Sequence, residues 1–306
     1  MNWFFIALGA PFLWAFVNIA DSYLISKYSQ KDKERSSGGL VIFSSLIGIF
    51  IAFLMSIFVS GLFDISFLDK VLLFVAGCLT VVWTILYLYT LEIEDISSVV
   101  PWFLTVPVFG YVLGYIFLGE TLSFYQIVGS IIIFSGLILI SINFREGKKI
   151  LKKKPLVYMA FACFIIAVSG VIFKYVTIEG NFWVSSFWEY LGLGVTGLLI
   201  YFFITKHREE FMYMNKTGGH KIFSVNVVSE LMSISGNLLT NFALLLAPVV
   251  MVFLVSSFQP AIVLFLTILG TKFFPHIVKE DLSLKVLFPK IVAIVLMTVG
   301  SVILFL

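Results

Sequence analysis

Ten apolar stretches, divided into two sets of five by a short basic segment, are the feature that most constrains how this chain can fold. Each stretch is close to the ~20 residues that an α-helix needs to cross a bilayer. The expected spans are residues 3–25, 40–59, 71–91, 97–118, 124–143, 156–177, 182–204, 222–246, 249–270 and 286–306. Only 12% of the 306 residues are charged, against ~25% in soluble domains. The sequence therefore predicts an all-α integral membrane protein.

The odd number of spans in each set determines how the two sets relate to the membrane. A second set of five must enter the membrane upside down relative to the first. Inverted repeats of this kind occur in secondary transporters, whose substrate sites lie between the repeats near the bilayer midplane. We therefore expect ten transmembrane helices in two inverted five-helix repeats, residues 1–143 and 156–306, joined by a basic linker at 144–155.

Basic residues gather in loops on one side of the predicted membrane. The loops after the first, fifth, seventh and ninth spans hold four, six, four and three of them, against Lys70 alone on the other side. Because Lys and Arg in short loops stay cytoplasmic, we expect these loops inside and both termini outside a multi-pass plasma-membrane protein. The loops would also contact anionic lipids. No aromatic stacking surface accompanies them, so we expect no nucleic-acid partner. A monomer and a homodimer are both open.

The two sets share a proline in the fourth and ninth spans and an acidic turn before the fifth and tenth. Pro107 and Pro260 are 153 positions apart, and the turns read Leu118-Gly-Glu-Thr-Leu-Ser123 and Lys279-Glu-Asp-Leu-Ser283. With the glycine-bearing fifth span, these features resemble the EamA-type family of the drug/metabolite transporter superfamily. The resemblance implies that spans one, three, four, six, eight and nine enclose the cavity. Members of that family usually have cytoplasmic termini, whereas the distribution of lysines here predicts the reverse.

The paired prolines indicate where a site could lie. A proline inside a helix removes one amide donor and leaves a carbonyl four residues earlier without its partner. In hydrocarbon this carbonyl must be satisfied by protein or by cavity water. Helix breaks at Pro107 and Pro260, at matching places in the two sets, are therefore a pointer to a transport site.

Polar and aromatic residues at helical spacing identify candidate cavity walls. In the eighth span Asn226, Glu230, Ser233, Asn237 and Asn241 are spaced by three or four positions, which places them on one helix face. Because charged and amide groups are costly in lipid, this face should meet the bundle interior or water. The substrate-cavity candidates are Trp14, Asn18, Trp83, Tyr87, Trp102, Glu189, Glu230, Asn237, Asn241 and Gln259.

Four ionisable residues inside spans invite functional hypotheses. Glu189 and Glu230 are candidates for proton coupling, since burial favours the neutral form of a carboxyl group; a structural hydrogen-bonded role is the alternative. Asp21 and Lys174, also 153 positions apart, are gate candidates. The simpler interpretation is that Asp21 reaches interfacial water and that Lys174, like Lys290, extends its ammonium group out to the membrane surface.

Several protein classes find no support in the motifs. The chain has no His-Glu-x-x-His pair, no Gly-x-Ser-x-Gly elbow and no phosphate-binding loop. Cys78 and Cys163 fall inside spans without metal-ligand spacing. We therefore expect no catalytic residue, metal or cofactor, and disfavour a membrane enzyme or a receptor. The expected function is secondary transport, in the export direction, of a small polar metabolite such as an amino acid, by alternating access. A nucleotide sugar or a lipid-linked head group is the alternative substrate.

Overall fold

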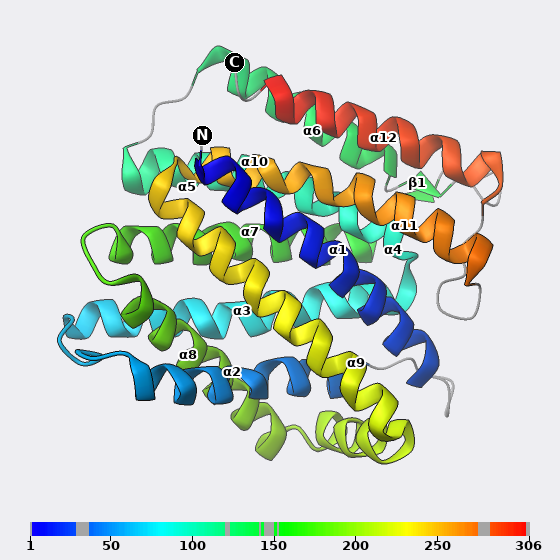
Figure 1. The fold of residues 1–306 in the computed structure, drawn as a ribbon. Coiled ribbons are helices and arrows are strands. Elements are labelled where there is room, and N and C mark those ends of the chain that lie inside the picture. Colours follow the sequence, from blue (N-terminus) through cyan, green and yellow to red (C-terminus); the bar gives the residue numbers. More distant parts are fainter. Residues whose placement is uncertain are drawn as a thin grey trace.

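In the computed structural model, the protein is a bundle of long helices (Figure 1). The structure describes residues 2–28, 37–119, 123–140, 142–143, 150–151, 153–274 and 282–303. Most of the basic linker and the acidic positions Glu120 and Glu280 lie outside these residues. The helices of the first half are α1 (Asn2–Tyr28), α2 (Gly38–Phe58), α3 (Phe67–Ile93), α4 (Ile96–Val99), the 3-10 helix η1 (Val100–Thr105), α5 (Val106–Leu118) and α6 (Phe124–Ile140). Those of the second half are α7 (Lys153–Thr177), α8 (Phe182–Phe203), α9 (Thr205–Leu246), α10 (Val249–Val255), η2 (Ser256–Phe258), α11 (Gln259–Phe273) and α12 (Leu284–Ile303).

Eight segments in the described part of the chain are helices long and apolar enough to cross a membrane. They coincide with the first to fourth and the sixth to ninth predicted spans, so the prediction of an all-α, multi-pass membrane protein is confirmed. The fifth and tenth predicted spans fall on α6, which has 17 residues, and on α12, which has 20. These two helices pack against each other at one edge of the bundle. Many large apolar side chains point outward, as a lipid environment requires.

The segment after the seventh span departs from the prediction. The sequence placed a loop between residues 204 and 222, whereas α9 is helical from Thr205 onwards. Lysine, arginine, glutamate and methionine, which are good helix formers, are frequent in this segment. The helix changes direction at Gly219, whose φ of 57° is a conformation that glycine adopts without steric cost.

Both membrane segments that carry the paired prolines are interrupted helices. In the fourth segment, α4 passes through η1 into α5, and Pro107 lies in the first turn of α5. In the ninth, α10 passes through η2 into α11, and Pro260 lies in the first turn of α11. A proline is tolerated in a first helical turn because the amide it lacks has no helical partner there. The change from one helical winding to another therefore occurs just before each proline.

Helix contacts occur in matching pairs between the two halves. α1 packs against α9 as α7 packs against α3, and α2 packs against α9 as α8 packs against α3. α1 also contacts α11, and α7 contacts α5. The remaining large contacts, α2 with α8 and α6 with α12, join helices at the same position in each half.

Two glycines allow α3 and α8 to approach each other closely. Gly77 lies against the backbone of Glu189, and Gly192 lies against the carbonyl group of Phe74, so that neither glycine has room for a side chain. This approach fixes the position of Glu189 beside α3. Figure 1 also shows that α1 begins and α12 ends at one end of the bundle, whereas strand β1 (Ile142–Asn143), paired with β2 (Ile150–Leu151), lies at the other end.

Candidate functional site

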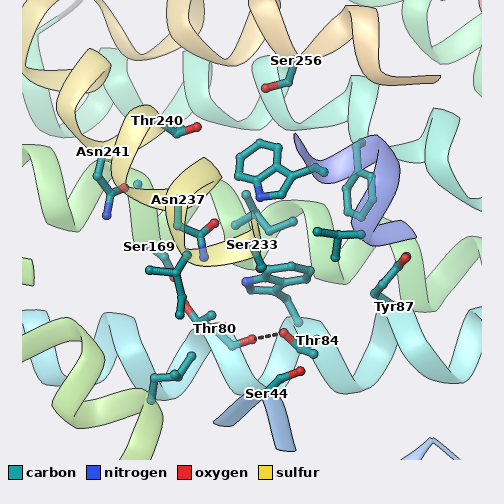
Figure 2. Close-up of a pocket in the computed structure, with 18 of the residues that line it drawn as sticks. Ser44, Thr80, Thr84, Tyr87, Ser169, Ser233, Asn237, Thr240, Asn241 and Ser256 are labelled. Carbon is teal, nitrogen blue, oxygen red and sulfur yellow. Dashed lines mark hydrogen bonds between the residues drawn. The ribbon is translucent and has the colours of Figure 1, made fainter. Parts of the chain in front are cut away.

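A cavity of about 190 Å³ lies in the middle of the bundle, with walls from both halves of the chain. Its sides come from α1, α2, α3, η1 and α5 of the first half and from α7, α8, α9, α10, η2 and α11 of the second. Figure 2 shows polar side chains of α9 and α3 facing one another across this space. The volume is below the ~300–1,000 Å³ of sites for drug-sized ligands, so the space suits a small solute.

Nine of the ten predicted cavity residues line this space. They are Trp14, Asn18, Trp83, Tyr87, Glu189, Glu230, Asn237, Asn241 and Gln259. Their convergence follows from helical periodicity, because each polar stripe lies on one helix face and the stripes face the same interior.

Trp102 does not line the cavity. It is 3% exposed, and its backbone carbonyl accepts a hydrogen bond from the Cys163 thiol of α7 at 3.2 Å. The next residue, Phe103, lines the cavity instead. Both belong to η1, which has three residues per turn, so its side chains point in other directions than they would in an uninterrupted α-helix.

One hydrogen-bonded chain on the cavity wall links three helices. The Gln259 amide of α11 donates to the Asn18 side-chain oxygen at 2.7 Å. The Asn18 amide donates to the Tyr87 hydroxyl oxygen at 2.6 Å, and the Tyr87 hydroxyl donates to an Asp21 carboxylate oxygen at 3.3 Å. The three hydrogen bonds therefore run in one direction, from the Gln259 amide to the Asp21 carboxyl group.

The other two cavity acids each bind one polar side chain from a neighbouring helix. The Asn241 amide of α9 donates to a Glu189 carboxylate oxygen at 2.8 Å. The Ser44 hydroxyl of α2 donates to a Glu230 carboxylate oxygen. Both acids are therefore held in place by helices other than their own.

Aromatic rings form a third part of the wall. The rings of Trp83, Tyr87 and Phe103 lie with centroids 5.5 to 6.3 Å apart. Trp14 of α1 also lines the cavity. Such ring separations are typical of favourable aromatic contacts, so these side chains support one another as one wall.

The two gate candidates occupy different environments. Asp21 lines the cavity, whereas Lys174 does not. Lys174 is 8% exposed, and its ammonium group donates to the Ala247 carbonyl oxygen at 2.8 Å. The interpretation that Lys174 extends to the membrane surface is therefore wrong. Its charge instead meets a carbonyl left free at the end of α9, where a cation is favoured.

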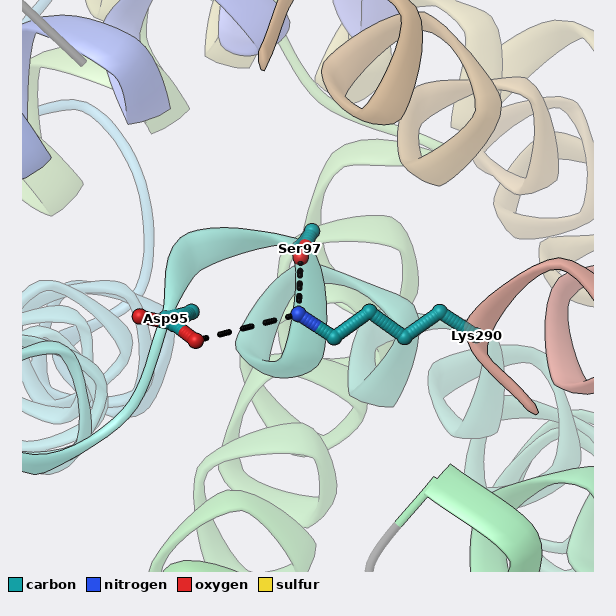
Figure 3. A network of polar contacts seen from close by, with 3 residues as sticks. All are labelled: Asp95, Ser97 and Lys290. Atoms are coloured by element: carbon teal, nitrogen blue, oxygen red, sulfur yellow. Dashed lines mark hydrogen bonds and ion pairs between the residues drawn. The ribbon is translucent and has the colours of Figure 1, made fainter. Parts of the chain in front are cut away.

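Lys290 is likewise buried rather than extended to the surface. Its ammonium group donates to the Ser97 hydroxyl oxygen at 2.6 Å and lies 3.9 Å from an Asp95 carboxylate oxygen (Figure 3). The contact joins α12 to the start of α4, so the expectation of a membrane-surface lysine is wrong here too.

Some lining residues escaped the sequence analysis. Ser44, Ser169 and Ser256 line the cavity from α2, α7 and η2. A serine in a helix often bonds its own backbone, so its presence gives little signal of a site.

The comparisons with known proteins agree with this architecture. Residues 1–142 match the EamA-like transporter family. A solved structure, described only as the crystal structure of a protein, is similar over 99% of this chain and 95% of its own, with a TM-score of 0.62. Its sequence is 13% identical, so the likeness shows the fold alone. No curated protein sequence matches this chain.

Proposed function

We propose that this membrane protein, whose residues 1–142 match the EamA-like transporter family, is a secondary transporter of a small polar metabolite. The observation that carries the proposal is the small cavity between helices of both halves, which has three acidic side chains in its wall. A site between two repeats is where alternating access places a solute, because one half can rock against the other around it.

The matching helix contacts support two inverted five-helix repeats, residues 1–143 and 156–306. If each helix is replaced by its counterpart in the other half, the contact of α1 with α9 becomes the contact of α7 with α3. The contact of α1 with α11 likewise becomes the contact of α7 with α5. The interrupted helices at Pro107 and Pro260 occupy equivalent places under the same exchange.

The charge distribution supports a plasma-membrane orientation. Strand β1, which precedes the basic linker, lies at one end of the bundle, and α1 begins and α12 ends at the opposite end. By the tendency of Lys and Arg to stay inside, we place the linker in the cytoplasm and the termini outside.

The cavity chemistry favours an amino-acid-sized solute over a nucleotide sugar or a lipid phosphate. Asp21, Glu189 and Glu230 line the cavity, and no basic side chain lines it in the described part of the chain. A diphosphate would meet uncompensated negative charge there, which a buried anion cannot tolerate. The small volume disfavours the same bulky substrates.

We further propose that Glu189 and Glu230 couple export to proton entry. Glu189 lies about two turns into α8 from one end of the bundle, and Glu230 about two turns into the membrane-spanning part of α9 from the other. Acids at two depths suit alternate exposure to the two compartments. A solute and protons that use the same groups would travel in opposite directions, so an inward proton gradient drives export.

Reconstituted liposomes test this proposal. Flux of a panel of labelled small metabolites is measured with and without a pH gradient, for the wild type, Glu189→Gln, Glu230→Gln and the double variant. The exposed loop residue Glu179 supplies a matched control, Glu179→Gln.

We expect Glu230→Gln to retain solute exchange and to lose accumulation driven by the pH gradient, because glutamine keeps the shape but cannot release a proton. Normal accumulation by both single variants and the double variant would show that the acids are structural. Absence of flux for every metabolite in the wild type would contradict the transport proposal itself.

A further inference from the structure

The cavity has an imbalance of charge that the protein itself does not correct. Three carboxyl groups line it, those of Asp21, Glu189 and Glu230, and no Lys, Arg or His of the described residues lines it. The two buried lysines bind elsewhere, Lys174 to Ala247 and Lys290 to Ser97. Buried carboxylates need a positive partner, so protons or a bound cation must supply one.

Asp21 differs from the other two acids in how its carboxyl group is supported. The three donors of Gln259, Asn18 and Tyr87 are aligned toward it, and Asn18 and Gln259 are 5% and 3% exposed. Hydrogen bonds aligned in one sense polarise one another and favour a charged acceptor at the end of the chain. Asp21 is therefore the one cavity acid whose donor is itself polarised by further hydrogen bonds, and we take it as the first candidate for an ionic partner.

The wall beside Asp21 is aromatic. Tyr87 donates to Asp21, and its ring belongs to the cluster with Trp83 and Phe103. Ring faces attract organic cations through their quadrupole, and sites for ammonium compounds combine such rings with a carboxylate.

We propose that the solute carries a net positive charge, as an ammonium or guanidinium compound of small size, with Asp21 as its anchoring carboxylate. This inference rests on the proposed function and narrows its substrate class. The inference also predicts that the cationic solute competes with protons for the cavity carboxyl groups. The ionisable groups that face the cavity are Asp21, Glu189, Glu230, Tyr87 and Tyr190, and protonation of the acids removes the charge that attracts the cation.

Binding to the purified full-length protein in detergent tests the inference. Calorimetry compares choline with its neutral isostere 3,3-dimethyl-1-butanol and with the zwitterion betaine, and guanidinium with urea. The variants are Asp21→Asn and, as a matched control, Asp64→Asn, which changes an exposed loop aspartate. A second measurement needs no variant: proton release on addition of either cation to the wild type in weak buffer.

We expect at least one cation to bind roughly tenfold or more tightly than its neutral partner, the scale of one charge-assisted hydrogen bond. Asp21→Asn should abolish this preference and Asp64→Asn should keep it. Acidification should weaken binding by at most about tenfold per pH unit for each proton displaced, and the wild type should release protons when the cation binds.

Three results would overturn the inference. They are equal binding of cations and neutral partners, a preference that survives in well-folded Asp21→Asn, and cation binding without proton release or pH dependence. The liposome assay separates this failure from failure of the transport proposal. Flux of a neutral or anionic metabolite would refute cation selectivity alone, whereas cation binding without any flux would refute transport alone.

Discussion

The side-chain amide of Asn241 donates a hydrogen bond of 2.8 Å to the Glu189 carboxylate, across the contact between α9 and α8. In low-dielectric surroundings a buried carboxyl group depends on such a donor. We expect Asn241→Leu to lower the free energy of unfolding by about 1–3 kcal/mol, because the acid loses its partner but stays buried. Thermal unfolding in detergent measures this loss, with Ser235→Ala at an exposed position of α9 as the control.

A double-mutant cycle identifies the contact as the cause. If Glu189 and Asn241 interact, the loss caused by Asn241→Leu should shrink when Glu189 is already glutamine. Strictly additive losses would show that the two side chains do not depend on each other.

Lys174 offers a prediction that separates a structural role from a gating role. Its ammonium group is buried and bound to the Ala247 carbonyl oxygen at the end of α9. Lys174→Met keeps the length of the side chain but removes this donor, and should lower the free energy of unfolding by about 1.5–3 kcal/mol, as for hydrogen bonds to charged groups. Lys154→Met, at an exposed position of the same helix, should leave stability unchanged.

Flux measurements on the same variants complete this test. A structural lysine predicts normal solute exchange per folded molecule in Lys174→Met. Unchanged stability together with lost exchange would instead identify Lys174 as part of a gate.

Periodicity explains how much of the site was predictable. Spacings of three and four placed Glu230, Asn237 and Asn241 on one helix face, and burial of polar groups in lipid implied that this face lines an interior. The spans followed from length and apolar composition in the same way. These inferences need only local sequence.

The remaining features depend on contacts between distant segments. The partner of Lys174 is a backbone carbonyl 73 residues away, and that of Lys290 is a hydroxyl 193 residues away, so no local pattern indicates either contact. The general tendency of lysines to extend to the membrane surface was misleading for both. Trp102 was misplaced for a local reason, since the winding of η1 directs Phe103 to the cavity instead.

Lys290 makes a second buried contact that can be tested. It joins α12 to α4 through Ser97 and Asp95, of which Asp95 is 35% exposed. We expect Lys290→Met to lower the free energy of unfolding by about 1–3 kcal/mol, because the Ser97 hydroxyl loses its donor inside the interface. Lys285→Met, at an exposed position of α12, is the control. A stability of Lys290→Met equal to that of the control would show that this contact does not hold α12 in place.

His207 gives a prediction for pH, at a position outside the membrane-spanning segments. Burial lowers the pKa of His207 below its ordinary value of 6.5, and Lys206 acts in the same direction, whereas Glu210 opposes them. The Nε2 atom lies 3.2 Å from the Tyr89 hydroxyl, and Nδ1 is buried without a partner among the described residues. The folded protein therefore resists protonation of this ring.

The sign of the effect follows from linkage between proton binding and folding. As the pH falls through 6.5, the unfolded chain takes up a proton at His207 before the folded chain does, so acid destabilises the fold. The loss grows until the pH reaches the lower pKa of the folded state and is absent well above 6.5. We expect unfolding temperatures of the wild type to fall more steeply between about pH 7.5 and 5.5 than those of His207→Gln, since the histidine titration lies in this range. His220→Gln, at an exposed position of α9, should follow the wild type. Parallel pH profiles for the wild type and His207→Gln would show that His207 is as free to take up a proton in the folded chain as in the unfolded one.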